Sequence, residues 1–196
     1  MRKLLLTACL GIMLMASCLV SGASAGNYPV NDVDLIRKML LQPDADFSLF
    51  IGGELCDAFM YLIDTDDNER VVHRAVARLW QTGDERSVPY LIEYMDKYPM
   101  DCLYGLGSFS TPDSCYALLA HLNDDDEFNR RFSAQSLGKL DYTVTDEMWS
   151  LRDTVLAKLG ERFEKEKEEW ILPILSDAYM AVSVQVLPEE DTGLSN

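Results

Sequence analysis

Apolar residues recur with helical spacing in two consecutive segments near the middle of the chain. Between positions 72 and 79 they fall at i, i+3, i+4 and i+7, and the same spacing returns between positions 88 and 95. This spacing places the side chains on one face of an amphipathic helix. The residues concerned are Val72, Ala75, Val76 and Leu79, followed by Val88, Leu91, Ile92 and Met95. The pattern therefore predicts two helices, each with one buried face.

The stretch between these helices, QTGDERS at positions 81–87, has the composition of a tight turn. Gly83 suits the left-handed conformation that follows many helix ends, and Asp84 or Ser87 suits the N-cap of the next helix. Pro89 falls in the first turn of that helix, where the missing N–H costs little. The whole segment is predicted to be a helix, a turn and a second helix.

This helical pair recurs along the chain. A shift of 27 residues superimposes Leu79 on Leu106, Val88 on Cys115, Leu91 on Leu118 and Met95 on Leu122. In the second copy, Ser110 or Thr111 suits the N-cap, and Pro112 suits the helix start. A third copy opens at 124–140, and its second helix keeps the apolar spacing at Met148, Val155 and Leu159. Self-similarity of this period is typical of helical solenoids.

The ends of the chain are less regular than its middle. Segments 31–41 and 46–64 are predicted to form an N-terminal helical pair, which Gly52 and Gly53 weaken locally. Segment 168–182 is predicted to be a final helix that bends or restarts near Pro173. Residues 26–187 are thus expected to form one all-α repeat domain, and the polar residues 188–196 a disordered tail.

The turn and the third copy resemble the HEAT-like repeats of the PBS-lyase type. The turn of that family commonly reads G-D-x-R-x-V-x-x-L-I, and this chain has Gly83, Asp84, Arg86, Val88, Leu91 and Ile92 at those places. The first helix of the family is matched by Arg130 or Arg131, Ala134, Leu137 and Gly138. The resemblance covers about residues 59–160, and the middle copy lacks the arginine after its turn. It implies a short right-handed α-solenoid of about four helical pairs.

Composition and charge narrow the classes of partner. The chain has 196 residues, of which 48% are hydrophobic and 26% charged, as expected for one globular unit with a sizeable core. Its formal net charge of -16 repels phosphate backbones and anionic lipid head groups. We therefore expect no nucleic-acid partner, and a protein partner that is basic or apolar.

The first residues are typical of a secretory signal. Arg2 and Lys3 precede an apolar run over residues 4–20, and Ala23-Ser24-Ala25 is an A-x-A cleavage site that would leave Gly26 first. Cys18 offers a second site, because LMASC resembles a bacterial lipoprotein box, in which that cysteine carries lipid. Residues 1–25 are therefore expected to direct export, to the periplasm or cell envelope, with a lipoprotein as the alternative. An uncleaved signal anchor is a further alternative.

The charged residues of the turns allow a catalytic and a structural interpretation. Asp84, Glu85 and Arg86 could supply a catalytic acid and an anion clamp, but helix capping is the favoured role. The HEAT-like resemblance also implies that Asp84 and Arg86 fix one repeat to the next. The acidic segments 64–69 and 123–127 could bind calcium, yet they lack the EF-hand pattern. Capping roles at the following helices are expected instead.

The histidines and cysteines give little support to catalysis or metal binding. His73 and His121 lie on different predicted helices without the Cys/His spacing of a zinc site, so no metal and no cofactor is expected. Cys102 or Cys115 could pair with His121 as a nucleophile, although both cysteines occupy predicted core positions. Cys102 and Cys115 fall on facing helices of one repeat, and we expect a disulfide between them, with Cys56 free.

One aromatic stripe is the leading candidate for a binding surface. Tyr90, Tyr94 and Tyr98 are four residues apart, on a face roughly opposite the predicted core stripe, and His121 takes the place of Tyr94 in the next copy. The resemblance implies that second helices line the concave side, where tyrosines favour recognition. Packing against the C-terminal helices is the alternative. We therefore expect a non-enzymatic binding or scaffold protein of the bacterial envelope, with a lyase-like enzyme or enzyme subunit as the alternative.

Mass spectrometry of the processed protein checks the predicted signal. The expected result is an N-terminus at Gly26, because the A-x-A site ends at Ala25. A diacylated Cys18 would instead establish a lipid anchor, and a retained Met1 would contradict processing altogether.

Overall fold

The computed structural model describes residues 30–50 and 52–187; the predicted signal and the predicted tail lie outside this range. Over the described residues the chain is entirely helical, without a strand, as the sequence predicts. The helices are α1 (Val30–Leu40), α2 (Gly52–Thr65), α3 (Glu69–Val76), the 3₁₀ helix η1 (Leu79–Thr82), α4 (Ser87–Glu93), α5 (Pro99–Leu106), α6 (Pro112–His121), α7 (Glu127–Leu137), α8 (Asp146–Lys165) and α9 (Leu172–Ser183). None of these helices is long and apolar enough to span a bilayer.

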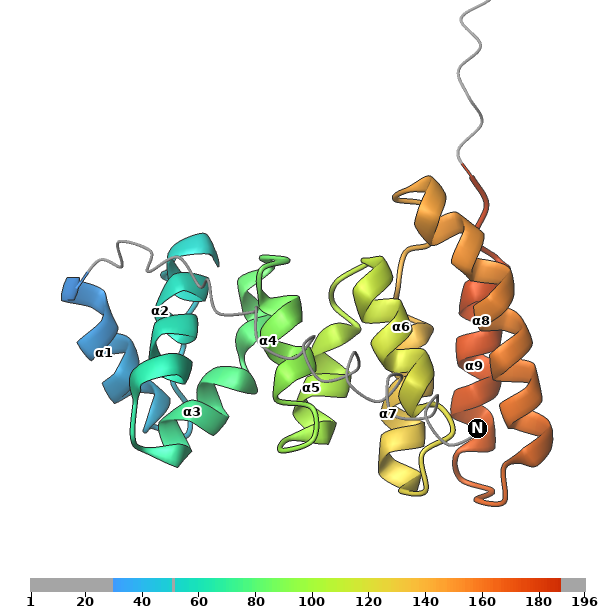
Figure 1. Ribbon diagram of the computed structural model, residues 1–196, viewed down its shortest axis with the longest axis horizontal. Helices are drawn as coiled ribbons and strands as arrows, with labels where there is room; N and C mark the ends of the chain where they lie inside the picture. The colour runs from blue at the N-terminus through green and yellow to red at the C-terminus, as the bar shows by residue number, and fades with distance from the viewer. Residues whose placement is uncertain (1–29, 51, 188–196) are drawn as a thin grey trace, which may run out of the picture.

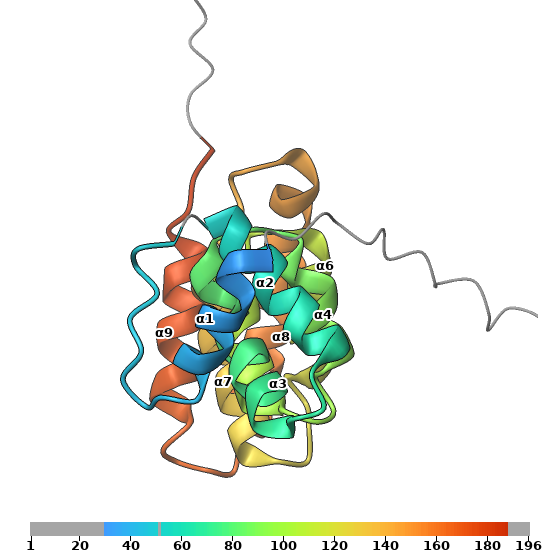
Figure 2. The same ribbon diagram turned by 90° about the vertical axis from the view of Figure 1, so that its left-hand side faces the viewer.

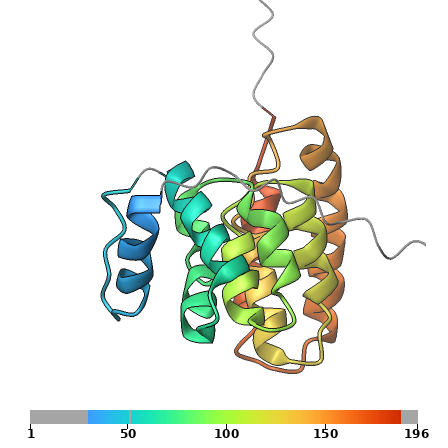
Figure 3. The same ribbon diagram turned by 60° about the vertical axis from the view of Figure 1, so that its left-hand side comes forward.

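The helices follow one another along the long axis of the molecule in chain order (Figures 1 and 3). Two rows can be traced through the packing. In one row α1 packs on α3, η1 on α5, α5 on α7, and α7 on α9. In the other row α2 packs on α4, α4 on α6, and α6 on α8. The end-on view shows α1, α3, α7 and α9 on one side and α2, α4, α6 and α8 on the other (Figure 2).

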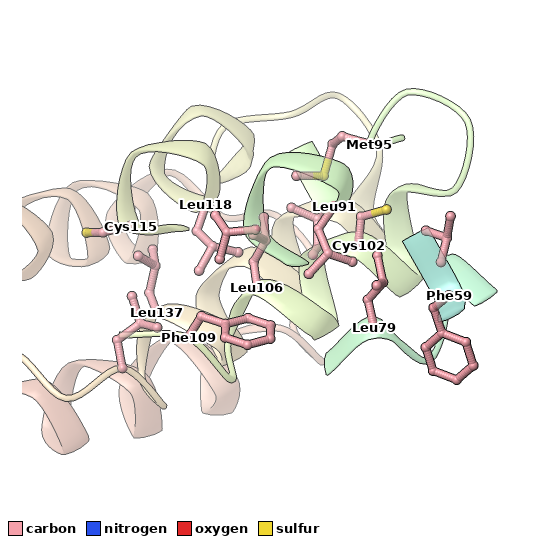
Figure 4. Packing of buried hydrophobic residues seen from close by; sticks show 14 of the residues in the cluster. Phe59, Leu79, Leu91, Met95, Cys102, Leu106, Phe109, Cys115, Leu118 and Leu137 are labelled. Carbon is pink, nitrogen blue, oxygen red and sulfur yellow. The ribbon is translucent and has the colours of Figure 1, made fainter. Parts of the chain in front are cut away.

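A continuous apolar core separates the two rows. Leu79 and Leu106, which the 27-residue shift superimposes, are fully buried, and so is Leu137 in the third copy. The other superimposed residues are also buried, and each is at most 5% exposed. They are Val88 and Cys115, Leu91 and Leu118, and Met95 and Leu122. Figure 4 shows several of these side chains meeting in one layer. The 27-residue repeat in the sequence therefore corresponds to a repeat in burial.

Ile92 departs from the predicted core stripe. Its side chain is 39% exposed, whereas Val88, Leu91 and Met95 on the same segment are buried. The helix α4 has only seven residues, so its buried face is narrow, and Ile92 lies outside it. Its placement in the core was wrong.

Short polar side chains define where the helices begin. Asn68 caps α3, Thr111 caps α6, Asp126 caps α7 and Thr145 caps α8, and each side chain accepts a hydrogen bond from a backbone N–H of the first turn. Pro112 occupies the first turn of α6, as predicted. The acidic segments thus end in helix caps, the favoured of the two predicted roles.

The predicted weak point at Gly52 was wrong. Gly52 does not interrupt a helix but begins α2, at a place where a Cβ atom would lie 2.2 Å from the carbonyl oxygen of Thr82. Glycine is needed there because the start of α2 approaches the end of η1 so closely. The last helix restarts near Pro173, which is one of the two predicted outcomes: α9 begins at Leu172, and Pro173 lies in its first turn.

Arginines connect elements that are about one repeat apart in sequence. Arg37 pairs with Asp66, Arg86 with Asp57, and Arg130 with Glu166, at separations of 29, 29 and 36 residues. Two others donate to carbonyl groups at the ends of neighbouring helices. Arg74 donates to Leu40 O, and Arg152 to Val182 O and Ser183 O. These contacts compensate the free carbonyl groups of helix C-termini, which also attract cations.

The Arg130–Glu166 pair is the most enclosed of these contacts. The Arg130 Nε and Nη2 atoms each lie 3.0 Å from a carboxylate oxygen of Glu166, and Nη1 donates to the carbonyl groups of Asp124 and Asp125. The Glu166 side chain is fully buried. Burial opposes its charge, but hydrogen bonds from Arg130 and two backbone N–H groups outweigh it and lower the pKa to about 2.

Replacing Arg130 should destabilise the protein because Glu166 would stay buried with fewer donors. We expect Arg130→Met to lower the free energy of unfolding at neutral pH by about 3 kcal/mol in urea titrations. The exposed Arg70→Met serves as the control and should change it by less than about 0.5 kcal/mol. Equal effects of the two variants would contradict a stabilising role of the pair.

The same pair should make stability depend on pH. The folded pKa of Glu166 lies below its ordinary value of 4.5, so the folded state favours the charged form. Its contribution is therefore complete above pH 4.5 and is lost as the pH falls towards 2. Urea titrations between these pH values should show a smaller loss of stability in Glu166→Gln than in the wild type.

Candidate functional site

The three tyrosines of the predicted stripe form a row between α4 and α5. Tyr90 lies in α4, Tyr94 directly follows that helix, and Tyr98 directly precedes α5. Backbone bonds from Tyr94 N to Tyr90 O and from Tyr98 N to Tyr94 O keep the helical spacing, and the rings of Tyr94 and Tyr98 stack with centroids 6.2 Å apart. All three rings are partly buried and pack against the core. They are less exposed than a purely external recognition stripe would be.

The partners of this tyrosine row come from the end of α2 and from α3. Tyr90 donates a hydrogen bond to Asp64 over 3.0 Å, and Tyr98 donates to Glu69 over 3.4 Å. The ring of His73 stacks on Tyr98 with centroids 4.2 Å apart. These contacts lie on the N-terminal side of the row. The alternative prediction, in which the tyrosines pack against the C-terminal helices, placed the contacts on the other side.

Charged groups surround the same rings. Nε2 of His73 lies 2.8 Å from Oδ2 of Asp101. The Lys97 ammonium is 3.2 Å from Glu69 and 5.3 Å from the centre of the Tyr98 ring. Burial, together with the nearby charge of Glu93, raises the pKa of Tyr94. The row therefore presents neutral phenols among carboxylates, an arrangement suited to recognition of a cationic group.

A hollow of about 730 Å³ adjoins the tyrosine row on its N-terminal side. Its lining contains four acids and one arginine, and one of these acids, Glu69, also accepts the hydrogen bond from Tyr98 of the row. Arg37 pairs with Asp66, which lowers the pKa of that carboxyl group. The lining residues are Val33, Asp34, Arg37, Tyr61, Leu62, Thr65, Asp66, Asp67, Asn68 and Glu69. The structure thus combines an acidic segment and an aromatic stripe that the sequence presents separately.

His121 belongs to a different part of the molecule from the tyrosine row. It ends α6, and its Nδ1 atom lies 3.1 Å from Asp124 in the connector to α7. Asp124 also accepts hydrogen bonds from Asn129 and from the backbone N–H of Asp126. The contacts of His121 therefore order the connector between α6 and α7.

The 83–86 turn joins η1 to α4 and contacts the earlier helix α2 through the Arg86 side chain. Gly83 has a φ of 64°, and Asp84 accepts a hydrogen bond from the backbone N–H of Arg86. The Arg86 side chain contacts Asp84 and also reaches Asp57 in α2 at 2.7 Å. Its hydrogen bond lowers the pKa of Asp84. These charges are already paired within the fold. The prediction that Asp84 or Ser87 caps α4 was wrong, because Arg86 precedes the helix without a side-chain cap and Ser87 is its first residue.

The disulfide expected between Cys102 and Cys115 is absent from the structure. Both are free and buried, as is Cys56. Burial raises the pKa of Cys102 to about 12 and that of Cys115 to about 11, which disfavours the thiolate. In Figure 4 the side chains of Leu106 and Leu118 lie between the two cysteines. The repeat places both residues in the core, but in successive layers and not opposite each other.

A second aromatic group lies at the far end of the molecule and was missed in the sequence. Phe128 at the start of α7 and Trp170 just before α9 have ring centroids 5.7 Å apart, and they are 44% and 41% exposed. The Arg131 guanidinium lies 5.8 Å from the Trp170 ring and 4.9 Å from that of Phe132. Each ring follows a run of acidic residues, which is the sequence signal that could have identified the pair.

The described residues contain no cluster of three or more histidine, cysteine or acidic side chains that could hold a metal ion. Comparison of the chain with known protein families gave no match, and comparison with curated proteins gave none either.

The partial burial of the tyrosine row predicts a moderate contribution to stability. We expect Tyr94→Ala to lower the free energy of unfolding by about 1–3 kcal/mol, less than for a fully buried ring. Tyr94→Phe keeps the ring and should change it by less than about 0.5 kcal/mol. Urea titration of both variants checks this, and an unchanged Tyr94→Ala would contradict packing of the ring.

Proposed function

We propose that this protein is a short, right-handed HEAT-like α-solenoid that is exported to the bacterial cell envelope and binds a protein partner there without catalysing a reaction. The two helix rows and the burial repeat support the solenoid. The contacts of Arg37, Arg86 and Arg130 across about one repeat support it further. Export rests on the signal-like N-terminal sequence.

The tyrosine row beside the acidic hollow is the single observation that carries the proposed function. Tyrosines combine a large apolar surface with a polar tip, and they are enriched in protein interfaces. Here the row borders a hollow whose ten lining residues include four acids and one arginine. Apolar and cationic groups of a partner would find complementary groups side by side, which is the pattern of a binding surface.

The lowered pKa values of two carboxyl groups support binding better than the enzyme alternative. Catalytic acids and bases are recognised by shifts that a reaction would use. The lowered pKa values of Asp66 and Asp84 instead follow from hydrogen bonds with Arg37 and Arg86, which join helices to one another. These carboxylates are occupied in holding the fold.

Site-specific photo-crosslinking in the producing cell tests this proposal. A benzoylphenylalanine at position 94 should give a discrete protein adduct, because this ring is expected in the interface. The same probe in place of the exposed Tyr116 or Tyr179 is the control and should not give that adduct.

A second variant separates binding from stability. Tyr90→Leu together with Tyr98→Leu keeps apolar volume in the row and should weaken the adduct at position 94 by tenfold or more, on the order of the energy of one interface anchor. The matched pair Tyr116→Leu and Tyr179→Leu should leave it unchanged. Adducts that do not depend on the probe position would contradict a specific surface.

A further inference from the structure

Seven of the connectors between the described helices lie along two edges of unequal charge. Connectors 66–68, 94–98, 122–126 and 166–171 lie along one edge, at the bottom in Figure 1. Connectors 83–86, 107–111 and 138–145 lie along the opposite edge. The first edge carries nine acids and two lysines, and the second carries three acids and two bases. We call the first set of connectors the acidic edge.

The charge of the acidic edge persists after its internal ion pairs are considered. Arg37 neutralises Asp66, and Arg130 neutralises Glu166, so seven acids still face two lysines. Asp67, Asp96 and Asp125 are exposed, so their field acts on the solvent side. An exposed field of this kind attracts cationic partners, and the attraction weakens as salt is added.

Aromatic pairs interrupt the acidic edge at two places. Tyr94 and Tyr98 stack in the connector between α4 and α5. Phe128 and Trp170 meet across the start of α7 and the connector before α9, and both are more than 40% exposed. The Arg131 guanidinium lies over the Trp170 ring, 5.8 Å from its centroid. Exposed, oriented aromatic rings are the usual anchors of protein interfaces.

The spacing of these pairs suits an extended polypeptide. Tyr98 precedes α5 and Trp170 precedes α9, and α5, α7 and α9 are successive neighbours in one row. Packed helices lie about 8–10 Å apart, so two steps span about 16–20 Å. An extended chain covers about 3.3–3.6 Å per residue, which corresponds to about five or six residues.

We infer that the acidic edge binds an extended basic segment of the partner. Two apolar residues about five or six positions apart would contact the two aromatic pairs, and lysines or arginines between them would face Asp96 and Asp125. A further cationic side chain would enter the hollow beside Glu69. This inference rests on the proposed binding function and adds the chemistry and the path of the partner.

Fluorescence anisotropy with defined peptides tests the inference on the full chain. The probe is a fluorescein-labelled peptide of about twelve residues, with two leucines about five positions apart and lysines between and beside them. Its counterpart has glutamate in place of each lysine. The lysine peptide should bind and lose affinity with rising salt, and the glutamate peptide should not bind. Failure of the lysine peptide to bind would overturn the inference.

Matched variants locate the binding. Phe128→Ala with Trp170→Ala should weaken binding about tenfold or more, whereas Tyr116→Ala with Tyr179→Ala should leave it within about twofold. Neutralising Asp67, Asp96 and Asp125 to asparagine should also weaken binding more than Asp44→Asn with Glu85→Gln and Glu147→Gln. Circular dichroism checks that each variant is folded. Equal effects of the two sets of substitutions would show that the peptide responds only to the overall charge of the protein. That result would overturn the inference that the acidic edge is the binding site.

The tyrosine row is assayed with the same peptide so that the two proposals can be separated. If Tyr90→Leu with Tyr98→Leu weakens binding but Phe128→Ala with Trp170→Ala does not, the path along the edge is wrong and the tyrosine surface stands. If a position-specific adduct forms at position 94 but the lysine peptide does not bind, the inferred basic character of the partner segment is wrong. The proposed binding function is not contradicted by that result. Loss of both results would overturn both proposals.

Discussion

No helical pair of this protein can bury its apolar face alone. The helices are short, down to the seven residues of α4, and isolated helices of that length are unstable in water. Their stability therefore depends on the apolar layer between the two rows, in which Leu79, Leu106 and Leu137 repeat. Each pair completes the core of the next, and the tyrosine row and the acidic hollow keep their positions only because that layer is continuous.

Polar contacts follow the same order as the apolar layer. Tyr90 with Asp64, Tyr98 with Glu69, and His73 with Asp101 are separated by 26, 29 and 28 residues, close to the sequence repeat. The groups that compose the candidate site are thus also contacts between successive repeats. A partner that binds them would act on the junctions of the pair α3–α4 with α2 on one side and α5 on the other, where a small change in the angle between helical pairs alters the whole surface.

The sequence predicts the periodic features well, because the apolar residues that pack in the core are the same residues that make the repeat visible in the sequence. Leu91, Leu118 and the caps Thr111 and Asp126 could be placed without the structure. Gly138, marked by the family resemblance, lies where a Cβ would come within 2.8 Å of Ala178. The candidate site could be predicted only in part. Tyr90 and Asp64 are distant in sequence, and no local pattern indicates that α4 will face α2.

The errors have physical causes as well. Ile92 fits the apolar spacing of a helix, but that spacing does not determine how wide a face of the helix is buried against the other row. The predicted disulfide required Cys102 and Cys115 to lie in the same layer of the core. A periodic sequence shows that both residues are buried but not which layer each one occupies. Gly52 was read as a weak point in a helix because the carbonyl group of Thr82, which it must accommodate, belongs to the next repeat.

The short sequence separation of these contacts has a consequence for folding. Because the polar contacts between repeats join residues about 30 positions apart, as Arg86 and Asp57 do, the contact order is low. Little loop-closure entropy is lost at each step, and a helical pair can dock as soon as the next pair has been synthesised. The chain can therefore fold progressively from α1 towards α9, without waiting for its C-terminal residues.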